Sequence, residues 1–105
     1  MTERIEYPAI FRWSNGDKAY LVTLIDFDAR TWGNDRSDAY DMAQDLLGNC
    51  IADYREENKP LPTPSEHLNR PLTKNEKMVN VAIYYDEWRA RAKVIDASVL
   101  NTELV

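Results

Sequence analysis

The sequence contains one cysteine, Cys50, and one histidine, His67, in 105 residues. A single cysteine excludes an internal disulfide framework and a zinc site built from several cysteines. Long apolar runs are also absent. The longest run, Ala19 to Ile25, is interrupted by Thr23 and is far shorter than the ~20 residues of a membrane-spanning helix. Residues 1–4 lack the basic and then apolar layout of a signal peptide, so we expect a cytoplasmic protein that makes no membrane contact.

Positive charge is in deficit, because 13 Lys and Arg face 18 Asp and Glu, which gives a net charge of −5. This balance excludes a strongly cationic nucleic-acid binder as the default interpretation, since an anionic protein repels phosphate overall. The hydrophobic content of 44% is ordinary for a globular protein. The length fits one domain of ~100–150 residues. We expect a single small domain.

The first third of the chain has the pattern of an antiparallel meander. Residues 5–13, 19–27 and 30–32 are rich in β-formers, and Asn15-Gly16 between the first two is a strong hairpin signal because both residues tolerate positive φ. Pro8 has no N–H to donate to a sheet ladder. The first strand is therefore predicted to lie at a sheet edge or to begin after Pro8.

A long amphipathic helix is predicted from Arg36 to Glu57. Asp35 is placed to cap it by accepting from the backbone of residue 37 or 38. Gly48 inside the helix suggests a close packing contact there, because glycine otherwise costs ~1 kcal/mol relative to alanine. Apolar residues recur at steps of three and four and trace one stripe: Ala39, Ala43, Leu46, Leu47, Cys50, Ile51 and Tyr54.

The remaining sequence predicts an extended segment and one further strand. Four prolines between residues 59 and 77 prevent regular structure. Residues 78–85 alternate as a strand, 86–89 fit a helical turn, and 93–95 fit another short strand. The fold class is therefore α+β, a small antiparallel sheet in β-β-β-α-β order with one long helix on one face. The other face must be polar or covered by a second subunit.

Four local strings in this order resemble the HicB-like antitoxin family. They are Tyr7-Pro8-Ala9-Ile10-Phe11, Tyr20-Leu21-Val22-Thr23 followed by a turn at Asp26, Gly33 to Ala39 with Ala43 and Leu46-Leu47, and Leu61-Pro62-Thr63-Pro64-Ser65. The resemblance covers roughly residues 7–85. In place of the Pro-Asp and Pro-Gly turn common in the family, this sequence has Ile25-Asp26-Phe27-Asp28-Ala29, so that turn must be built differently.

The resemblance implies a partial ribonuclease-H-like fold without its catalytic acids, which means no enzyme activity and no cofactor. It also implies a protein partner, a small basic HicA-like toxin that cleaves messenger RNA, and an acidic antitoxin suits such a partner. We place the HicB-like domain at residues 1–86 and a short tail or extra strand at 87–105. The tail shows no pair of amphipathic helices, so DNA binding by this chain alone is not expected. Exposed sheet edges favour a homodimer or higher oligomer.

Candidate partner-binding residues are aromatic anchors at strand ends and charges near the helix end: Trp32, Trp88, Arg89, Asp53, Glu56 and Glu57. For the two tryptophans, closing the ends of a thin core is an equal alternative. Asp26, Asp28, Asp38 and Asp86 lie where a nuclease holds metal ions, but turn and cap roles are favoured. No metal site is expected. His67 is expected in a solvated loop, and Cys50 in the core.

An alternative function is a stand-alone RNA-binding or regulatory domain without a toxin. Its candidate residues are the basic run Arg89, Arg91 and Lys93, with Arg70 and Lys74 upstream. A solvated surface is favoured for this run, because RNA readers of this size combine basic charge with stacking aromatics on one face. The sequence alone does not bring such residues together.

Overall fold

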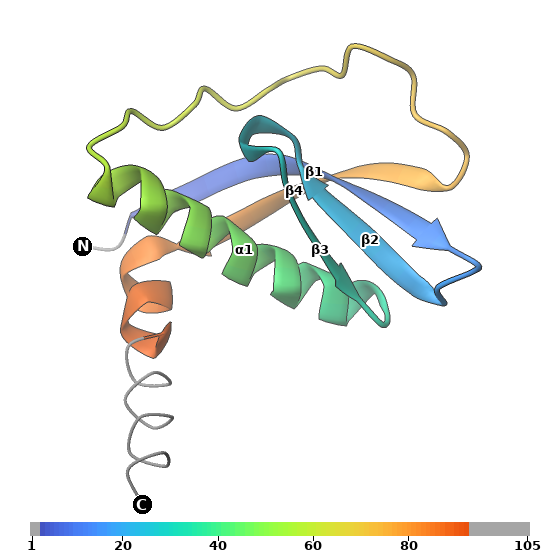
Figure 1. The fold of residues 1–105 in the computed structure, drawn as a ribbon, viewed down its shortest axis with the longest axis horizontal. Coiled ribbons are helices and arrows are strands. Elements are labelled where there is room, and N and C mark those ends of the chain that lie inside the picture. The colour runs from blue at the N-terminus through green and yellow to red at the C-terminus, as the bar shows by residue number, and fades with distance from the viewer. Residues whose placement is uncertain (1–2, 93–105) are drawn as a thin grey trace, which may run out of the picture.

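The computed structural model describes residues 3–92 of the chain (Figure 1). The strands are β1 (Arg4–Ser14), β2 (Ala19–Leu24), β3 (Ala29–Gly33) and β4 (Glu76–Tyr84), and the long helix is α1 (Arg36–Glu56). A short 3-10 helix, η1 (Ile25–Phe27), follows β2, and residues 85–92 are helical. The predicted α+β class, an antiparallel sheet with one long helix, is confirmed. The additional strand predicted at residues 93–95 lies outside the described residues.

The four strands form one antiparallel sheet in the order β3-β2-β1-β4. The prediction that β1 lies at an edge or begins after Pro8 is wrong, since β1 begins at Arg4 and is flanked by two strands. Pro8 is tolerated because β1 pairs with β2 only from Ala9 onward, whereas Pro8 lies opposite Asn80 of β4. A missing N–H therefore breaks no bond toward β2.

Two turns differ from the sequence prediction. Between β1 and β2 the positive φ of 54° belongs to Lys18, whereas the sequence pattern placed it at Asn15 and Gly16. The second strand ends at Leu24 instead of Phe27, because the chain enters η1 and then reverses at Asp28, whose φ is 50°. The chain thus makes this turn at a left-handed aspartate, without a glycine.

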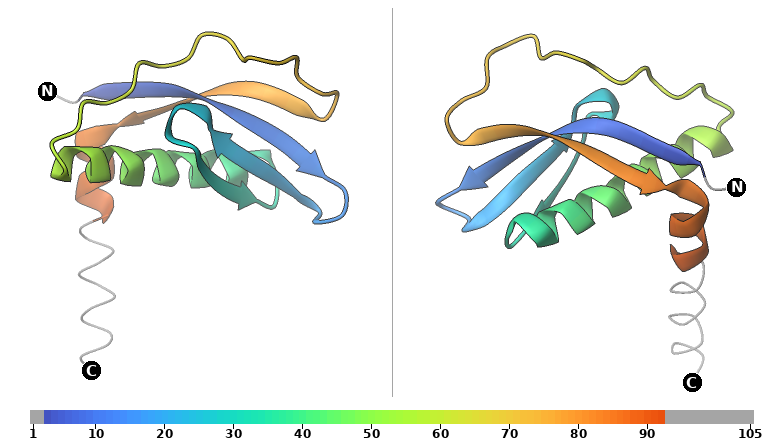
Figure 2. Two further views of the ribbon diagram at one scale, coloured as in Figure 1. Left: turned by 45° about the horizontal axis from the view of Figure 1, so that its top comes forward. Right: turned by 180° about the vertical axis from the view of Figure 1, so that it is seen from behind.

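The helix α1 begins as its sequence predicts. The Asp35 carboxylate accepts from the Asp38 backbone N–H at 2.8 Å, and the Asp38 carboxylate accepts from the Asn34 N–H at 2.8 Å. These two bonds satisfy backbone donors that no helical carbonyl reaches. The helix runs across one face of the sheet (Figure 2). No helix of residues 3–92 is long and apolar enough to cross a membrane.

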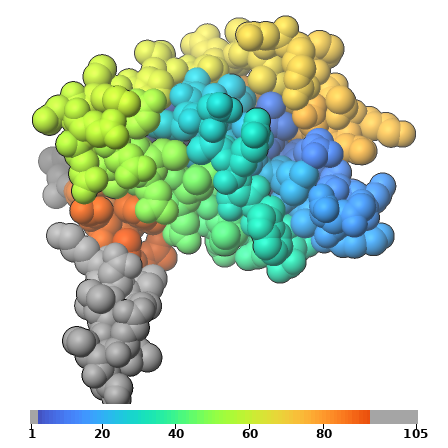
Figure 3. Space-filling view, viewed as in Figure 1, coloured from blue at the N-terminus to red at the C-terminus, as the bar shows by residue number. Residues whose placement is uncertain are grey.

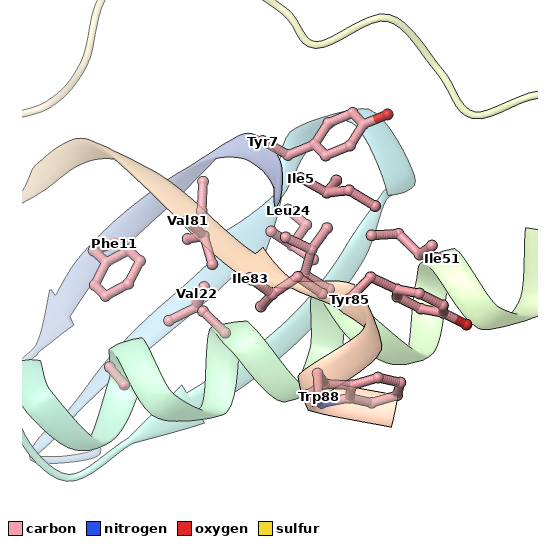
Figure 4. Packing of buried hydrophobic residues seen from close by; sticks show 14 residues of the cluster. Ile5, Tyr7, Phe11, Val22, Leu24, Ile51, Val81, Ile83, Tyr85 and Trp88 are labelled. Carbon is pink, nitrogen blue, oxygen red and sulfur yellow. The ribbon is translucent and has the colours of Figure 1, made fainter. Parts of the chain in front are cut away.

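The core lies between α1 and the face of the sheet that carries alternate residues of β1, β2 and β4 (Figure 4). Val22, Leu24, Leu47, Ile51 and Val81 are its largest fully buried side chains. Tyr40 and Gln44 of α1 also bind the outer edge of β4, where the Ala82 N–H donates to the Tyr40 hydroxyl at 3.2 Å and Gln44 donates to the Ala82 carbonyl at 2.9 Å. The helix thus covers one face of the sheet and protects one point of its edge.

Gly48 of α1 packs closely against Trp88 of the helical residues 85–92. A Cβ built on Gly48 would lie 2.2 Å from Cε2 and 2.3 Å from Cδ2 of Trp88. The Trp88 indole N–H donates to Asp45 at 3.2 Å, and the Arg55 guanidinium lies 4.5 Å from the centre of the Tyr85 ring. The helical turn predicted after β4 is confirmed, and the close packing contact predicted at Gly48 is made with Trp88.

The segment from residue 57 to 75 runs extended along one rim of the molecule (Figure 3) and is anchored at three places. The Tyr7 hydroxyl donates to the Pro62 carbonyl, and Ser65 donates through its N–H and its hydroxyl to the Asp26 carboxylate. Arg70 donates to both carboxylate oxygens of Glu76 at 2.8 and 2.9 Å. That side-chain bond, reinforced by the Thr73 N–H, lowers the pKa of Glu76 to about 2. The last anchor therefore stays ionised in ordinary buffers.

Candidate functional site

Acidic side chains gather at the C-terminal end of α1. Asp53, Glu56 and Glu57 are exposed there. Glu57 pairs with Lys59 at 2.9 Å. Asp53 and Glu56 have no basic side chain within 4.0 Å in the described part of the chain. Negative charge at this end opposes the helix dipole, so the two carboxylates do not stabilise the helix that carries them and are open to a cationic partner.

Trp32 lies on the opposite face of the sheet from α1, close to the beginning of that helix. It is 54% exposed, the largest value among the big apolar side chains of residues 3–92. Leu21 lies opposite Trp32 in the sheet, and Ile10, Arg12 and Arg30 line the same shallow hollow. The structure therefore does not bring Trp32 together with the acidic end of α1. It places them about a helix length apart, roughly 30 Å for 21 residues.

The expectation that Trp88 is an exposed anchor is wrong. Trp88 is 5% exposed because its ring lies against the bare backbone of Gly48 and beside the Tyr85 ring, whose centre is 5.9 Å away. Trp88 instead closes the end of the thin core, which is the alternative that the sequence offered. Arg89 follows Trp88 and is exposed on the helical residues 85–92, which pack beside the second half of α1.

Three of the four aspartates weighed as metal ligands have other contacts. Asp26 accepts from Ser65, Asp38 binds the backbone before α1, and Asp28 lies 3.9 Å from Arg30 in a turn. Asp86 is exposed on the helical residues 85–92. No group of three His, Cys, Asp or Glu side chains within residues 3–92 is arranged to hold a metal ion.

The lone histidine and the lone cysteine lie where the sequence predicts. His67 is exposed on the extended segment. Cys50 packs against the core, and its burial, followed by the charge of Asp53, raises the pKa of the thiol. A raised pKa keeps the sulfur protonated and unreactive.

A further feature, which the sequence did not reveal, is a groove between the start of α1 and the β1–β2 hairpin. We call it the aromatic–basic groove. Its lining comes from β1, β2, α1, the extended segment and β4, so no single stretch of sequence signals it. The lining residues are Phe11, Trp13, Tyr20, Arg36, Tyr40, Lys74, Asn75, Lys77 and Val79.

Comparison with known proteins relates the chain to bacterial antitoxins. The family described as HicB_like antitoxin of bacterial toxin-antitoxin system matches residues 6–85. A solved structure, "Toxin-Antitoxin complex from Streptococcus pneumoniae", is similar with a TM-score of 0.69 and 25% identity, over 82% of this chain and 73% of that one. No curated protein sequence matches the chain.

The class of protein is therefore that of the bacterial antitoxins. Because the family match covers most of the chain, the protein belongs to the HicB-like antitoxin family, and the resemblance read from the sequence is confirmed.

Proposed function

We propose that this protein is the antitoxin of a type II toxin–antitoxin system and neutralises a small basic toxin that cleaves messenger RNA. The observation that carries the proposal is the family match over residues 6–85, supported by likeness to a solved toxin–antitoxin complex. The protein acts in the cytoplasm, where messenger RNA is found, and works by binding and not by catalysis. A partial ribonuclease-H-like fold, as the family resemblance implies, serves here as a scaffold for binding surfaces.

The toxin-binding surface in this proposal is the acidic end of α1 with the neighbouring helical residues. Asp53 and Glu56 supply unpaired negative charge, and Glu57 lies beside them in its pair with Lys59. Arg89 is exposed on the helical residues 85–92, which pack against α1 through Trp88. A basic toxin is attracted to such a surface from a distance, which speeds association and selects the partner by charge.

Co-expression with the neighbouring small basic reading frame tests the proposed function. The neighbour expressed alone is expected to stop growth and to shorten cellular messenger RNA, and co-expression of this protein is expected to restore growth. The two chains are also expected to co-purify, with an empty vector as the control. A neighbour that is harmless alone, or that fails to co-purify, would contradict the antitoxin function and leave the stand-alone regulatory domain.

A second element of the proposal is a homodimer formed through the outer face of the sheet. Trp32 is 54% exposed beside Ile10 and Leu21, on the face that α1 does not cover, and half-exposed tryptophan is typical of interface anchors. Light scattering of the purified protein at high micromolar concentration is expected to give the mass of a dimer, and Trp32→Ala that of a monomer. A monomeric wild-type protein would refute this element.

A further inference from the structure

The aromatic–basic groove has a composition opposite to that of the whole protein. The chain carries 18 acidic against 13 basic side chains, yet the lining of the groove contains Arg36, Lys74 and Lys77 and no acidic residue. The three cations come from α1, the extended segment and β4, which meet at the end of the molecule away from the acidic end of α1 (Figure 2, right). The fold thus concentrates positive charge at one place in an anionic protein.

The three cations of the groove are available to a ligand. None of the three has a carboxylate oxygen within 4.0 Å among residues 3–92. Lys74 and Lys77 are exposed. Arg36 makes one long hydrogen bond, in which its Nε donates to the Tyr20 hydroxyl at 3.4 Å. The two terminal nitrogens of its guanidinium take no part in that bond. Unpaired cations around a hollow attract an anion.

Aromatic rings form the floor and wall of the same groove. Phe11 is buried, while Trp13, Tyr20 and Tyr40 are partly exposed. The Trp13 and Tyr20 rings are 4.9 Å apart and inclined at 59°, so they do not cover each other as a stack does. The Tyr40 hydroxyl is held by the Ala82 N–H, and the Trp13 backbone N–H binds the Asn75 carbonyl at 3.2 Å. These bonds fix the wall before any ligand arrives.

We propose that the aromatic–basic groove binds a short single-stranded segment of RNA. Flat rings next to unpaired cations match the two recurring parts of such a ligand, because bases stack on aromatic side chains while phosphates contact Lys and Arg. An acidic peptide satisfies the cations but brings no planar group to the rings. A duplex hides its base faces from them. The Asn75 side chain supplies a donor and an acceptor that suit a ribose 2′-hydroxyl.

Fluorescence anisotropy with a labelled single-stranded RNA of mixed sequence tests this inference on the full chain. We expect binding that quenches tryptophan emission and weakens by about 20-fold between 50 and 200 mM salt, the value for three neutralised phosphates. The variant K74E/K77E is expected to lose binding by at least tenfold. Both lysines are exposed, so the thermal midpoint should stay close to that of the wild type.

The matched control is R4E/R91E, which makes the same change in net charge at two exposed side chains that do not line the groove. It is expected to retain binding. Equal loss in both variants, or no binding at 50 mM salt, would overturn the inference. Double-stranded RNA, single-stranded DNA and polyglutamate serve as competitors, and displacement by any of them at the concentration effective for the RNA would overturn the assignment to single-stranded RNA. Toxin binding by K74E/K77E, measured separately, is expected to be unchanged. Failure of the RNA-binding inference can therefore be distinguished from failure of the proposed antitoxin function.

Discussion

Replacing Gly48 with alanine is expected to lower the free energy of unfolding by about 1–3 kcal/mol. The same substitution in most helices raises stability, since alanine is favoured over glycine by ~1 kcal/mol. Here the new methyl group would lie 2.2 to 2.6 Å from three atoms of the Trp88 ring. Moving the indole away from this methyl group would disturb its packing against Tyr85 and its hydrogen bond to Asp45 at 3.2 Å. Urea denaturation followed by circular dichroism measures the change.

Asn49→Ala is the matched control, because Asn49 is the next residue of the same helix and is exposed. It is expected to leave stability unchanged or to raise it by a few tenths of a kcal/mol. A smaller partner should relieve the collision, so Gly48→Ala combined with Trp88→Leu is expected to cost less than the sum of the two single variants. If Gly48→Ala were as stable as Asn49→Ala, the contact between α1 and the helical residues 85–92 would not be as described.

Local features of the fold were predictable from the sequence, whereas features made by distant contacts were not. The helix and its Asp35 cap depend on residues within one turn of each other, and the structure has both. The end of β2 at Leu24 was missed, and the η1 turn that follows it makes a distant contact, since the Asp26 carboxylate accepts from Ser65, which lies 39 residues away in sequence. No pattern within the strand contains that information.

The burial of Trp88 is a second feature that depends on contacts between distant residues. The sequence predicted a close contact at Gly48, and it offered Trp88 both as an anchor and as a lid on the core. Only the fold shows that the two residues meet. The aromatic–basic groove was missed for the same reason, since Trp13, Arg36 and Lys77 belong to three different elements. Because such a surface combines residues from several elements, no residue spacing within one stretch of sequence identifies it.

Reversing the two unpaired charges at the end of α1, as D53K/E56K, is expected to weaken toxin binding by about 100-fold while the fold stays intact. Placing like charges opposite each other costs several kcal/mol at an interface, and each 1.4 kcal/mol is tenfold in affinity. Stability should remain the same or rise slightly, because positive charge at a helix C-terminus complements the dipole that Asp53 and Glu56 oppose. Loss of binding without loss of stability separates a functional surface from a structural one. Affinity measured by biolayer interferometry on the co-purified partner gives the first quantity, and thermal denaturation gives the second.

The matched control is D17K/E66K, which reverses two exposed carboxylates on the β1–β2 turn and the extended segment. Its change in net charge is the same, so any general loss of attraction between an acidic and a basic protein affects both variants equally. The specific contact predicts a much larger loss for D53K/E56K, concentrated in the dissociation rate. Raising the salt concentration should narrow the difference between wild type and the control by screening long-range attraction. Equal affinity of the two variants would mean that Asp53 and Glu56 act only through the net charge of the protein. The toxin would then contact another face of this antitoxin.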